Sequence, residues 1–562
     1  MLIFHGWLLL LLAPFCYSSS TYEDYSRDRV KFFQHEDSLS INAAWELTPE
    51  EKVVDRLLEQ LKEADRLLDP VPVQFSFISM RTAIDNSNLY SFVETIPKGA
   101  LLHSHDVSSQ DMHFYVEMSY MNGCLYNVDD TSSDYGDLSF RPGPNFVPIE
   151  TIRNSWPDGV ASFDEALYRN FTITQYEDVA DTTGDFLWDQ FQPIFSRLHG
   201  AYQYAPVFRE YYRRMFPKLL ADGVSRWEMR TSLEPVYDSV RTYTQEETLG
   251  MVLEELHAWQ QEECSPAEAA ARQAFSFGLI MQGIRSGSPQ EVVEALSSAY
   301  ALREVFPELV LGFDLVGHED PGQTLYYWAP ILIDAQETLV EKCNCSALPF
   351  FFHAGESNRE SVQDNLVDAV LLNTSRIGHG FGIQAYPSLW PLINAKHVLI
   401  ESCPISNQLL GMVVDQRNHP VGQMLHHVQL HARDAYPNPD AGGARVLHTD
   451  PAWLEMQLYD PRVVQVMVGN RFRAALPVSI NNDDPGFWGI DAVVSYDWYV
   501  AVLGWDLSVA GIKQLAVDSI VRCGAPVHIR TRALLDWDVM WGQWIKTTAR
   551  AAGLGHNVGT VD

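Results

Sequence analysis

Residues 98–106, Lys-Gly-Ala-Leu-Leu-His-Ser-His-Asp, form an apolar run that ends in two histidines one residue apart. Alternate side chains of a β-strand lie on the same face, so His103 and His105 can offer two imidazole nitrogens to one metal ion. The pair alone is weak evidence, because His-x-His is frequent by chance and an isolated copy more often binds nothing. Its meaning depends on the other strand ends of the chain.

Four later apolar runs also end in polar side chains suited to metal chemistry. They are residues 350–356 with His353 and Glu356, residues 376–380 with His379, residues 398–403 with Glu401 and Cys403, and residues 478–484 with Asp483 and Asp484. Five such ends in one chain indicate strands that deliver side chains to a common site.

The alternation of helices with short apolar strands predicts the fold. The predicted strands are 99–103, 224–229, 275–281, 309–316, 350–353, 376–379, 397–401 and 477–481, and the predicted helices from residue 205 onward are 205–221, 244–263, 289–305, 327–342, 361–373 and 386–395. Apolar strands separated by helices are typical of an α/β protein with a parallel (β/α)8 TIM barrel, in which the strand ends meet at one catalytic face. An open doubly wound sheet would need a glycine-rich nucleotide turn after the first strand, and the sequence has none there.

The N-terminal part, residues 19–95, is expected to be an arm with helices that precedes the barrel. Polar and aromatic residues without periodicity predict an extended arm at 19–47. Thr48-Pro49-Glu50-Glu51 then offers an N-cap, a proline at the first helical position and a capping-box glutamate, which predict the start of a helix. Its apolar stripe would pack against a dimer partner or the main domain.

Two insertions are predicted within the barrel domain, residues 96–562. Residues 121–160 are rich in Asp, Ser, Gly and Pro and predict an inserted subdomain or a long loop. Sixty-two residues separate Pro420 from Asp483, where a barrel usually needs a single helix. The excess, at about 425–470, is expected beside the mouth of the active site as a lid or surface insertion.

Composition and the N-terminus indicate an exported protein. With 39 basic and 73 acidic residues among 562, the net charge is −34, which disfavours nonspecific binding to nucleic acid or anionic membranes. Residues 1–18, with an apolar centre at Leu8–Leu12, predict a signal peptide. The alternative is a membrane anchor, but this centre is too short to span a bilayer. We therefore expect a secreted protein with no membrane or nucleic acid partner.

Cysteines and glycosylation motifs agree with export. Asn170, Asn344 and Asn373 each begin an N-glycosylation pattern. Six cysteines remain after the predicted signal peptide, and none form a Cys-x-x-Cys motif, so one or two disulfide bridges plus buried thiols are expected.

The polar strand ends together form a ligand set for zinc. Three histidines and an aspartate, namely His103, His105, His353 and Asp483, give nitrogen and oxygen donors for one Zn²⁺ ion that activates water. Glu356 turns toward the site past Gly355, and a carboxyl group walled by aromatic residues can keep its proton and donate it to a substrate nitrogen. His379 would orient or deprotonate the water. Asp484 would face the substrate, or else cap the turn before Pro485.

Longer motifs resemble the adenosine deaminases, and among them the secreted adenosine-deaminase-related growth factors. The resemblance runs from about residue 95 to 550 and rests on residues 97–106, 205–212, 312–320, 351–357, 376–381, 401–408, 417–421 and 483–489. It implies a zinc barrel with the four ligands named above, in which Glu356 protonates the purine and His379 handles the water. It further implies that Gly317 and Asp484 contact the base, that Asp106 and the segment from Trp188 to Phe195 line the ribose side, and that the N-terminal arm forms a homodimer.

The sequence departs from this subfamily at the sugar side. Relatives commonly have His-Arg-Ser where this chain has Ile284-Arg285-Ser286, and the bridge expected in the inserted subdomain cannot form because only Cys124 is present there. An apolar Ile284 cannot hydrogen-bond a 5′-hydroxyl, so 5′-phosphates would be better tolerated if a cation such as Arg285, Arg433 or Arg445 lay nearby.

We therefore expect hydrolytic deamination of adenosine and 2′-deoxyadenosine, giving inosine or deoxyinosine and ammonia. The first alternative is the same chemistry on AMP, ADP or ATP. More distant alternatives are another metal hydrolase of the same barrel superfamily and a growth-factor-like binding protein in which catalysis is incidental.

Overall fold

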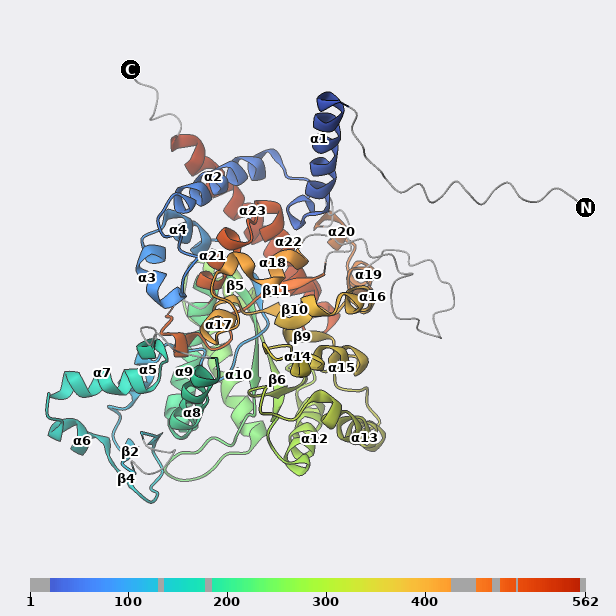
Figure 1. Cartoon of the computed structure of the whole chain (residues 1–562). Coiled ribbons are helices and arrows are strands. Elements are labelled where there is room, and N and C mark those ends of the chain that lie inside the picture. The colour runs from blue at the N-terminus through green and yellow to red at the C-terminus, as the bar shows by residue number, and fades with distance from the viewer. Residues whose placement is uncertain are drawn as a thin grey trace, which may run out of the picture.

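The computed structural model describes residues 21–129, 136–176, 184–425, 451–466, 476–491 and 494–555. The predicted signal peptide lies outside these residues. In Figure 1 the strands lie at the centre of the molecule and helices surround them. Among the described helices, none has the length and apolar character that crossing a membrane requires.

Eight parallel strands form the central barrel as two four-stranded sheets. The first has the order β1 (Gly99–Leu101), β5 (Val224–Thr231), β6 (Ser276–Ile284) and β7 (Val310–Val316), and the second has the order β8 (His353–Ala354), β9 (Arg376–His379), β10 (Leu399–Ser402) and β11 (Val478–Ile480). Single parallel bridges, Phe313 with Phe350 and Ser104 with Asp483, join the two sheets at their edges. The predicted (β/α)8 barrel is confirmed.

The seam between β1 and β11 is closed by side chains as well as by its bridge. Asn481 Oδ1 accepts hydrogen bonds from the backbone N–H groups of Leu102 and His103, at 2.9 and 3.1 Å. Helix α22 (Val509–Val521) packs over both strands, and the Ser519 hydroxyl accepts a hydrogen bond from the Ala100 N–H at 2.9 Å. The carboxyl ends of β1 and β11 are thereby held together.

Charged residues fill part of the barrel interior, although the strands read as almost continuously apolar. The fully buried side chains are Arg226, Glu228, Arg230, Asp314, Arg376 and Glu401. They pair in a continuous chain, in which Arg230 contacts Asp314 and Glu401 at 2.6 Å each and Arg376 contacts Glu228 at 2.6 Å as well as Glu401. Such buried charges are tolerated because each has an ionic partner.

The barrel helices follow the sequence closely where a capping residue or an N-terminal proline marks the start of the helix. Two have the predicted bounds, α9 (Ala205–Ala221) and α12 (Pro289–Val305), and α10 (Gln245–Gln261) and α13 (Leu325–Cys343) differ from prediction by one or two residues at each end. The predicted helix 361–373 is divided into α14 (Glu360–Gln363) and α15 (Asn365–Leu371). The predicted helix 386–395 begins later, as α16 (Trp390–Lys396), because Pro387 and Pro391 favour a short 3-10 turn before it.

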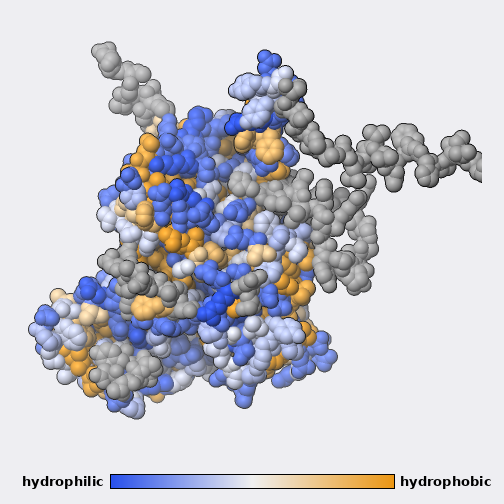
Figure 2. Space-filling view, viewed as in Figure 1, coloured by the Kyte–Doolittle hydropathy of each residue, from blue (hydrophilic) through white to orange (hydrophobic). Residues whose placement is uncertain are grey.

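The prediction of an extended arm at 19–47 was wrong. Residues Tyr22–Leu39 form helix α1, which Thr21 caps by accepting the Asp24 N–H. None of its side chains is buried, so no apolar stripe marks it in the sequence. The helix stands out from the rest of the molecule (Figures 1 and 2), and its exposed surface carries both hydrophilic and hydrophobic side chains.

The predicted helix after Thr48 is present as α2 (Pro49–Arg66), with the full Thr48–Glu51 capping box. It packs against the C-terminal helix α23 (Val527–Gly555) of the same chain, where Trp541 donates to Glu51 at 2.8 Å. Of the two partners considered for its apolar stripe, the main domain is the one in contact. Helices α3 (Phe77–Asp85) and α4 (Asn88–Glu94) then lead into β1.

Residues 121–160 contain regular structure in their described part. Strands β2 (Leu125–Asn127), β3 (Leu138–Ser139) and β4 (Phe146–Pro148) form a small antiparallel sheet, followed by α6 (Ile149–Ser155) and α7 (Val160–Asn170). These elements lie to one side of the barrel (Figure 1). Cys124 is a buried free thiol, and the disulfide bridge present among the described residues joins Cys343 to Cys345.

The long connection between β10 and β11 is only partly an insertion. Its described part includes α18 (Pro420–Met424), α19 (Pro451–Tyr459) and α20 (Val463–Val466). Helices α19 and α20 pack against α23, with an ion pair of 2.6 Å between Arg530 and Glu455. Of the two forms expected for this connection, a lid or a surface insertion, its described part matches the surface insertion. Arg433 and Arg445 lie outside the described residues.

Candidate metal centre and active site

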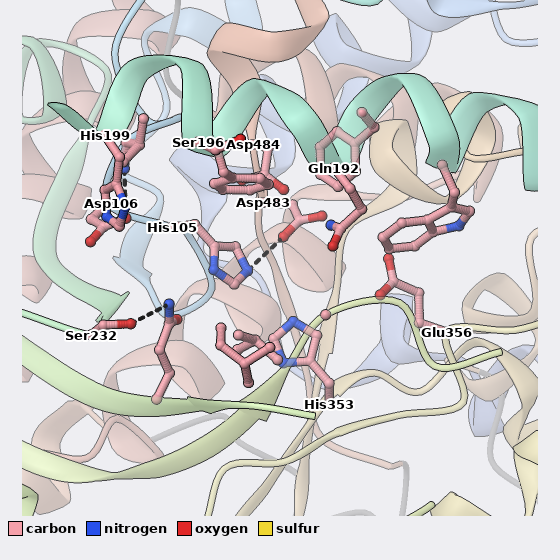
Figure 3. Close-up of a pocket in the computed structure, with 18 of the residues that line it drawn as sticks. His105, Asp106, Gln192, Ser196, His199, Ser232, His353, Glu356, Asp483 and Asp484 are labelled. Atoms are coloured by element: carbon pink, nitrogen blue, oxygen red, sulfur yellow. Dashed lines mark hydrogen bonds and ion pairs between the residues drawn. The ribbon is translucent and has the colours of Figure 1, made fainter. Parts of the chain in front are cut away.

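The four predicted metal ligands converge at the carboxyl ends of the strands. His103 and His105 follow β1, His353 is in β8, and Asp483 follows β11. All four are buried, and their ligand atoms lie within 4.8 Å of one another. Asp483 Oδ1 is 3.3 Å from His103 Nε2 and 3.2 Å from His105 Nε2, and Figure 3 shows His105 pointing toward Asp483.

Several buried polar atoms at this point have no hydrogen-bond partner. They are His103 Nε2, Asp483 Oδ1, His379 Nε2 and Glu356 Oε1. A buried polar atom without a partner is costly, and a cation bound between imidazole nitrogens and a carboxylate would satisfy the first two. The residues present therefore fit a divalent metal ion with nitrogen and oxygen ligands.

A second set of side chains orients the ligands. His103 Nδ1 lies 2.8 Å from Glu401, His353 Nδ1 lies 2.6 Å from Asp314, and Asp483 Oδ2 accepts the Ser406 hydroxyl at 2.7 Å. With a carboxylate at each Nδ1, both histidines direct Nε2 toward the centre. Arg230 bonds both Glu401 and Asp314, so one guanidinium holds both partners.

Burial keeps the imidazole of His353 neutral. Burial lowers the pKa of His353 to about 3, although the carboxylate of Asp314 acts in the opposite direction. Burial also opposes the ionisation of Asp314, but His353 and Arg230 outweigh it and hold the pKa of Asp314 well below its usual range. A neutral imidazole beside an ionised carboxylate is the form in which a histidine binds a metal.

Glu356, His379 and Asp484 lie beside the ligand cluster. Gly355, with φ of +78°, turns the chain after β8 so that Glu356 faces the centre, and Glu356 Oε1 is 3.3 Å from His379 Nε2. Burial, reinforced by the charge of Asp483, raises the pKa of Glu356 well above its usual range, and the same causes raise the pKa of Asp484. Ser108 donates to Asp484. Both carboxyl groups are therefore able to carry a proton near neutral pH.

A cavity of about 350 Å³ opens above the centre. Its lining includes the predicted residues Asp106, Trp188, Gly317, Glu356, Asp483 and Asp484, together with His105 and His353. Helix α8 (Gly184–Tyr202) crosses over it, and Figure 3 shows Gln192, Ser196 and His199 hanging from this helix. Trp188 stacks on His318 with ring centroids 4.2 Å apart, and Asp106 accepts the Thr231 hydroxyl at 2.7 Å.

Several lining residues carried no signal in the sequence. Ser196, His199, Ser232, Glu234 and Gln282 are single polar residues outside any motif, and only the path of the chain brings them to the cavity. Asp314 could have been found, because it is an acidic residue within an otherwise apolar predicted strand. Glu401 was among the polar strand ends, but its bond to His103 was not predicted.

The suggestion that Arg285 serves a phosphate was wrong. Ile284 does line the cavity and is 47% exposed, but the Arg285 side chain is fully buried. Its guanidinium donates to the backbone carbonyls of His353 at 2.7 Å and Leu315 at 3.3 Å. None of the described lining residues is a lysine or an arginine.

Sequence comparison places these features in a known family. The profile described as adenosine deaminase matches residues 188–432, and the profile described as adenosine/AMP deaminase N-terminal matches residues 6–93. Adenosine deaminase 2 of Pongo abelii is 30% identical over 525 residues, which cover 89% of each chain. The chain belongs to the adenosine deaminase family. Adenosine deaminase of Lutzomyia longipalpis, 29% identical, and adenosine deaminase 2 of Homo sapiens, 29% identical, cover 93% and 96% of the chain and 94% and 97% of their own lengths.

Solved structures support the fold of this adenosine deaminase family member. The Arabidopsis N6-mAMP deaminase has a TM-score of 0.50 and 14% identity, and covers 80% of this chain and 99% of its own. An Arabidopsis relative complexed with IMP has a TM-score of 0.50 and 13% identity, covering 81% and 99%. Within the family assignment, the cluster of three histidines and one aspartate is the candidate metal site.

Proposed function

We propose that this protein is a zinc-dependent deaminase that converts adenosine and water into inosine and ammonia, and 2′-deoxyadenosine into deoxyinosine. The observation that carries the proposal is the convergence of His103, His105, His353 and Asp483 at the base of a cavity lined by Glu356 and Asp484. The family assignment supports the same activity.

One Zn²⁺ ion per chain would be held by the four ligands. Imidazole nitrogen and carboxylate oxygen are the donors that catalytic zinc takes, and the cluster at these four residues includes no thiolate. When bound, the ion would supply Lewis acidity that lowers the pKa of water toward neutrality.

The neighbouring side chains divide the remaining work. Glu356, with its raised pKa, donates a proton to the purine ring nitrogen that gains electrons when water adds at C6. His379 holds the attacking water from the side of β9. Asp484 and the backbone at Gly317 contact the base, and the raised pKa of Asp484 suits it to donate to a ring nitrogen. Asp106 and Trp188, which line the cavity, would hold the ribose.

The cavity lining favours a nucleoside over a nucleotide. A phosphate dianion would enter a site whose described charged residues are acidic, including Asp106 and Glu234, and no described lysine or arginine faces it. Desolvating that charge without a cation is costly. Turnover of AMP, ADP or ATP is the alternative. It is supported by Ile284 at the cavity wall, because this apolar side chain cannot select for a 5′-hydroxyl by a hydrogen bond.

The remaining features are part of the same proposal. Residues 1–18 direct secretion, the exposed Asn344 and Asn373 carry glycans, residues 19–95 form a dimerisation region, and the barrel occupies residues 96–562. The Nδ2 atom of Asn170 is buried, so the third glycosylation pattern is not included. The acidic composition supports a small-molecule substrate and no nucleic acid or membrane partner.

Steady-state assays on adenosine, 2′-deoxyadenosine, AMP and ATP test the proposal, with zinc content measured on the same preparation. We expect kcat/KM for AMP to be at least about 10³-fold below that for adenosine, a gap of about 4 kcal/mol. AMP within about tenfold of adenosine would establish the nucleotide alternative. No turnover of any of these by a zinc-loaded preparation would favour the binding-protein alternative.

A further inference from the structure

A buried chain of hydrogen bonds runs from His379 away from the cavity. Asn407 Nδ2 lies 3.1 Å from His379 Nδ1, and Asn407 Oδ1 lies 3.1 Å from His419 Nε2. His419 Nδ1 in turn accepts the backbone N–H of Val421 at 3.2 Å, as the N-cap of α18. His379, Asn407 and His419 are all fully buried, so water does not compete for these bonds.

The backbone N–H of Val421 fixes every proton in this chain. An amide N–H can only donate, so His419 Nδ1 is an acceptor, and a neutral His419 then carries its proton on Nε2. That proton requires an oxygen acceptor at Asn407, which sets the orientation of the amide with Oδ1 toward His419. The Asn407 NH₂ group therefore faces His379 Nδ1, which must accept. A neutral His379 is left with its proton on Nε2, the nitrogen that faces the cluster.

Other contacts agree with this assignment. The second N–H of Asn407 has a sulfur acceptor, Met412 Sδ, at 3.9 Å. Burial lowers the pKa of His419 to about 3, so this ring is neutral at physiological pH. Asn407 belongs to α17 (Pro404–Leu409), whose first turn is tied down by Asp497, which accepts the Ile405 N–H at 3.1 Å.

We propose that Asn407 and His419 are positioning residues that hold His379 in the Nε2–H form. His379 then donates a hydrogen bond to the attacking oxygen and does not remove its proton, which the water would lose to solvent once a bound metal lowered its pKa. This inference rests on the proposed deaminase function and decides between the two roles, orienting or deprotonating, that the sequence left open for His379. His379 Nε2 has no hydrogen-bond partner among the described residues and lies 3.3 Å from Glu356 Oε1 and 4.0 Å from Asp483 Oδ2, so its N–H is available in the centre.

A spectroscopic measurement tests the tautomer without reference to activity. Zinc-loaded protein labelled with ¹⁵N only in histidine gives separate nitrogen resonances for protonated and bare ring nitrogens, and the His379→Gln variant identifies the His379 signals by difference. We expect a protonated Nε2 and a bare Nδ1. A bare Nε2 in the parent protein would overturn the proposal. If the parent showed the expected tautomer but did not turn over adenosine, the proposed function would fail while the assignment stood.

The kinetics of the variant Asn407→Asp show whether His379 acts as a hydrogen-bond donor or as a base. A carboxylate can only accept, so Nδ1 of His379 must carry a proton, and the neutral ring then presents a bare Nε2. At pH 9 we expect kcat to fall by on the order of 10² to 10⁴, as for a wrong histidine tautomer, with KM changed little and zinc retained.

The opposite profile would contradict the proposal. If His379 were the base, Asn407→Asp would strengthen it, and kcat at pH 9 would equal or exceed that of the parent. Asn88→Asp makes the same chemical change at an exposed position in the first turn of α4 and is the matched control, expected to behave as the parent.

The anchoring role of His419 is tested by a pair of substitutions. In His419→Gln the side-chain NH₂ can still donate to Asn407 Oδ1, so kcat should remain within a few-fold of the parent. In His419→Leu the amide of Asn407 is free to turn over, and kcat should fall by about tenfold, the equivalent of about 1.4 kcal/mol. Equal activity in both variants, at the same zinc content, would show that His419 does not position His379 through Asn407.

Discussion

Glu356 and Asp483 are two buried carboxyl groups whose environments move their pKa values in opposite directions. Burial acts on both to raise the pKa. At Asp483 the surrounding imidazoles of His103, His105 and His379 outweigh it, and the pKa lies well below the usual range. At Glu356 the charges of Asp483, Glu319 and Asp484 add to burial, and the pKa stays raised. One group is thus suited to bind a cation and the other to donate a proton.

Replacing Glu356 by glutamine separates these roles. The amide has nearly the same shape but cannot supply a proton, so we expect kcat to fall by about 10² to 10⁴. Zinc content, measured by elemental analysis, should stay at that of the parent. Loss of zinc from this variant would reassign Glu356 to the ligand set, and His353→Ala provides the comparison in which both zinc and activity should be lost.

At the scale of single residues, the sequence predicted side chains that end strands and missed those that only the fold brings together. His103, His105, His353 and Asp483 each follow an apolar run, and eight strands of one barrel must point their ends to one place. Asn407 and His419 follow no such rule, because their contacts depend on how the helices after β10 pack. The burial of Arg285 also depends on packing, since a terminal guanidinium can turn outward or inward from the same backbone.

At the scale of single elements, α8 covers the cavity and gives it an apolar wall through Trp188, Phe191 and Phe195. Trp188→Ala removes one side of that wall, so we expect KM for adenosine to rise by about 10-fold or more, with kcat within a few-fold. Asp189→Ala, exposed on the same helix, is the control and should leave both unchanged. A fall in kcat at unchanged KM would instead place Trp188 at the chemical step.

Within the barrel, Arg230 forms ion pairs with Asp314 and Glu401, whose carboxylates are fully buried away from water. Arg230→Met leaves Asp314 and Glu401 short of a buried counter-charge, so the free energy of unfolding should fall by about 3–5 kcal/mol. Arg169→Met breaks an exposed ion pair with Glu165 and should cost less than about 1 kcal/mol. Denaturant titration of both variants measures the difference. Equal costs would mean that the buried network contributes no more than a surface pair.

Elements with capping residues were predictable and elements without an apolar stripe were not. Ser288 and Glu291 cap α12, and its predicted bounds were the observed ones. Helix α1 buries no side chain and gave no periodic signal. Helix α8 contains Pro193 in its interior, a residue that argues against a helix, yet it packs tightly over the site.

At the scale of the whole molecule, α1 has the surface of an element that awaits a partner. Tyr22 is 81% exposed, Phe32 60% and Tyr25 53%. A second copy of the chain would cover these side chains in the proposed homodimer. Deleting residues 21–39 should therefore convert a dimer to a monomer in sedimentation measurements, with little change in thermal stability because α1 buries nothing in its own chain. A truncated protein that remains dimeric would place the interface elsewhere.

The way the barrel closes gives the proposed zinc ion a second consequence. The two four-stranded sheets meet through single bridges, and the ligands divide between them, with His103 and His105 beside β1 and with His353 and Asp483 beside β8 and β11. An ion held by all four would act as a clasp across the seam, and its binding free energy would oppose the opening of the barrel. Removal of the ion by a chelator should then accelerate amide hydrogen exchange first in β1 and β11 and only later in β5 and β6. The loss of one ion would thus open the barrel wall at the seam between its two sheets.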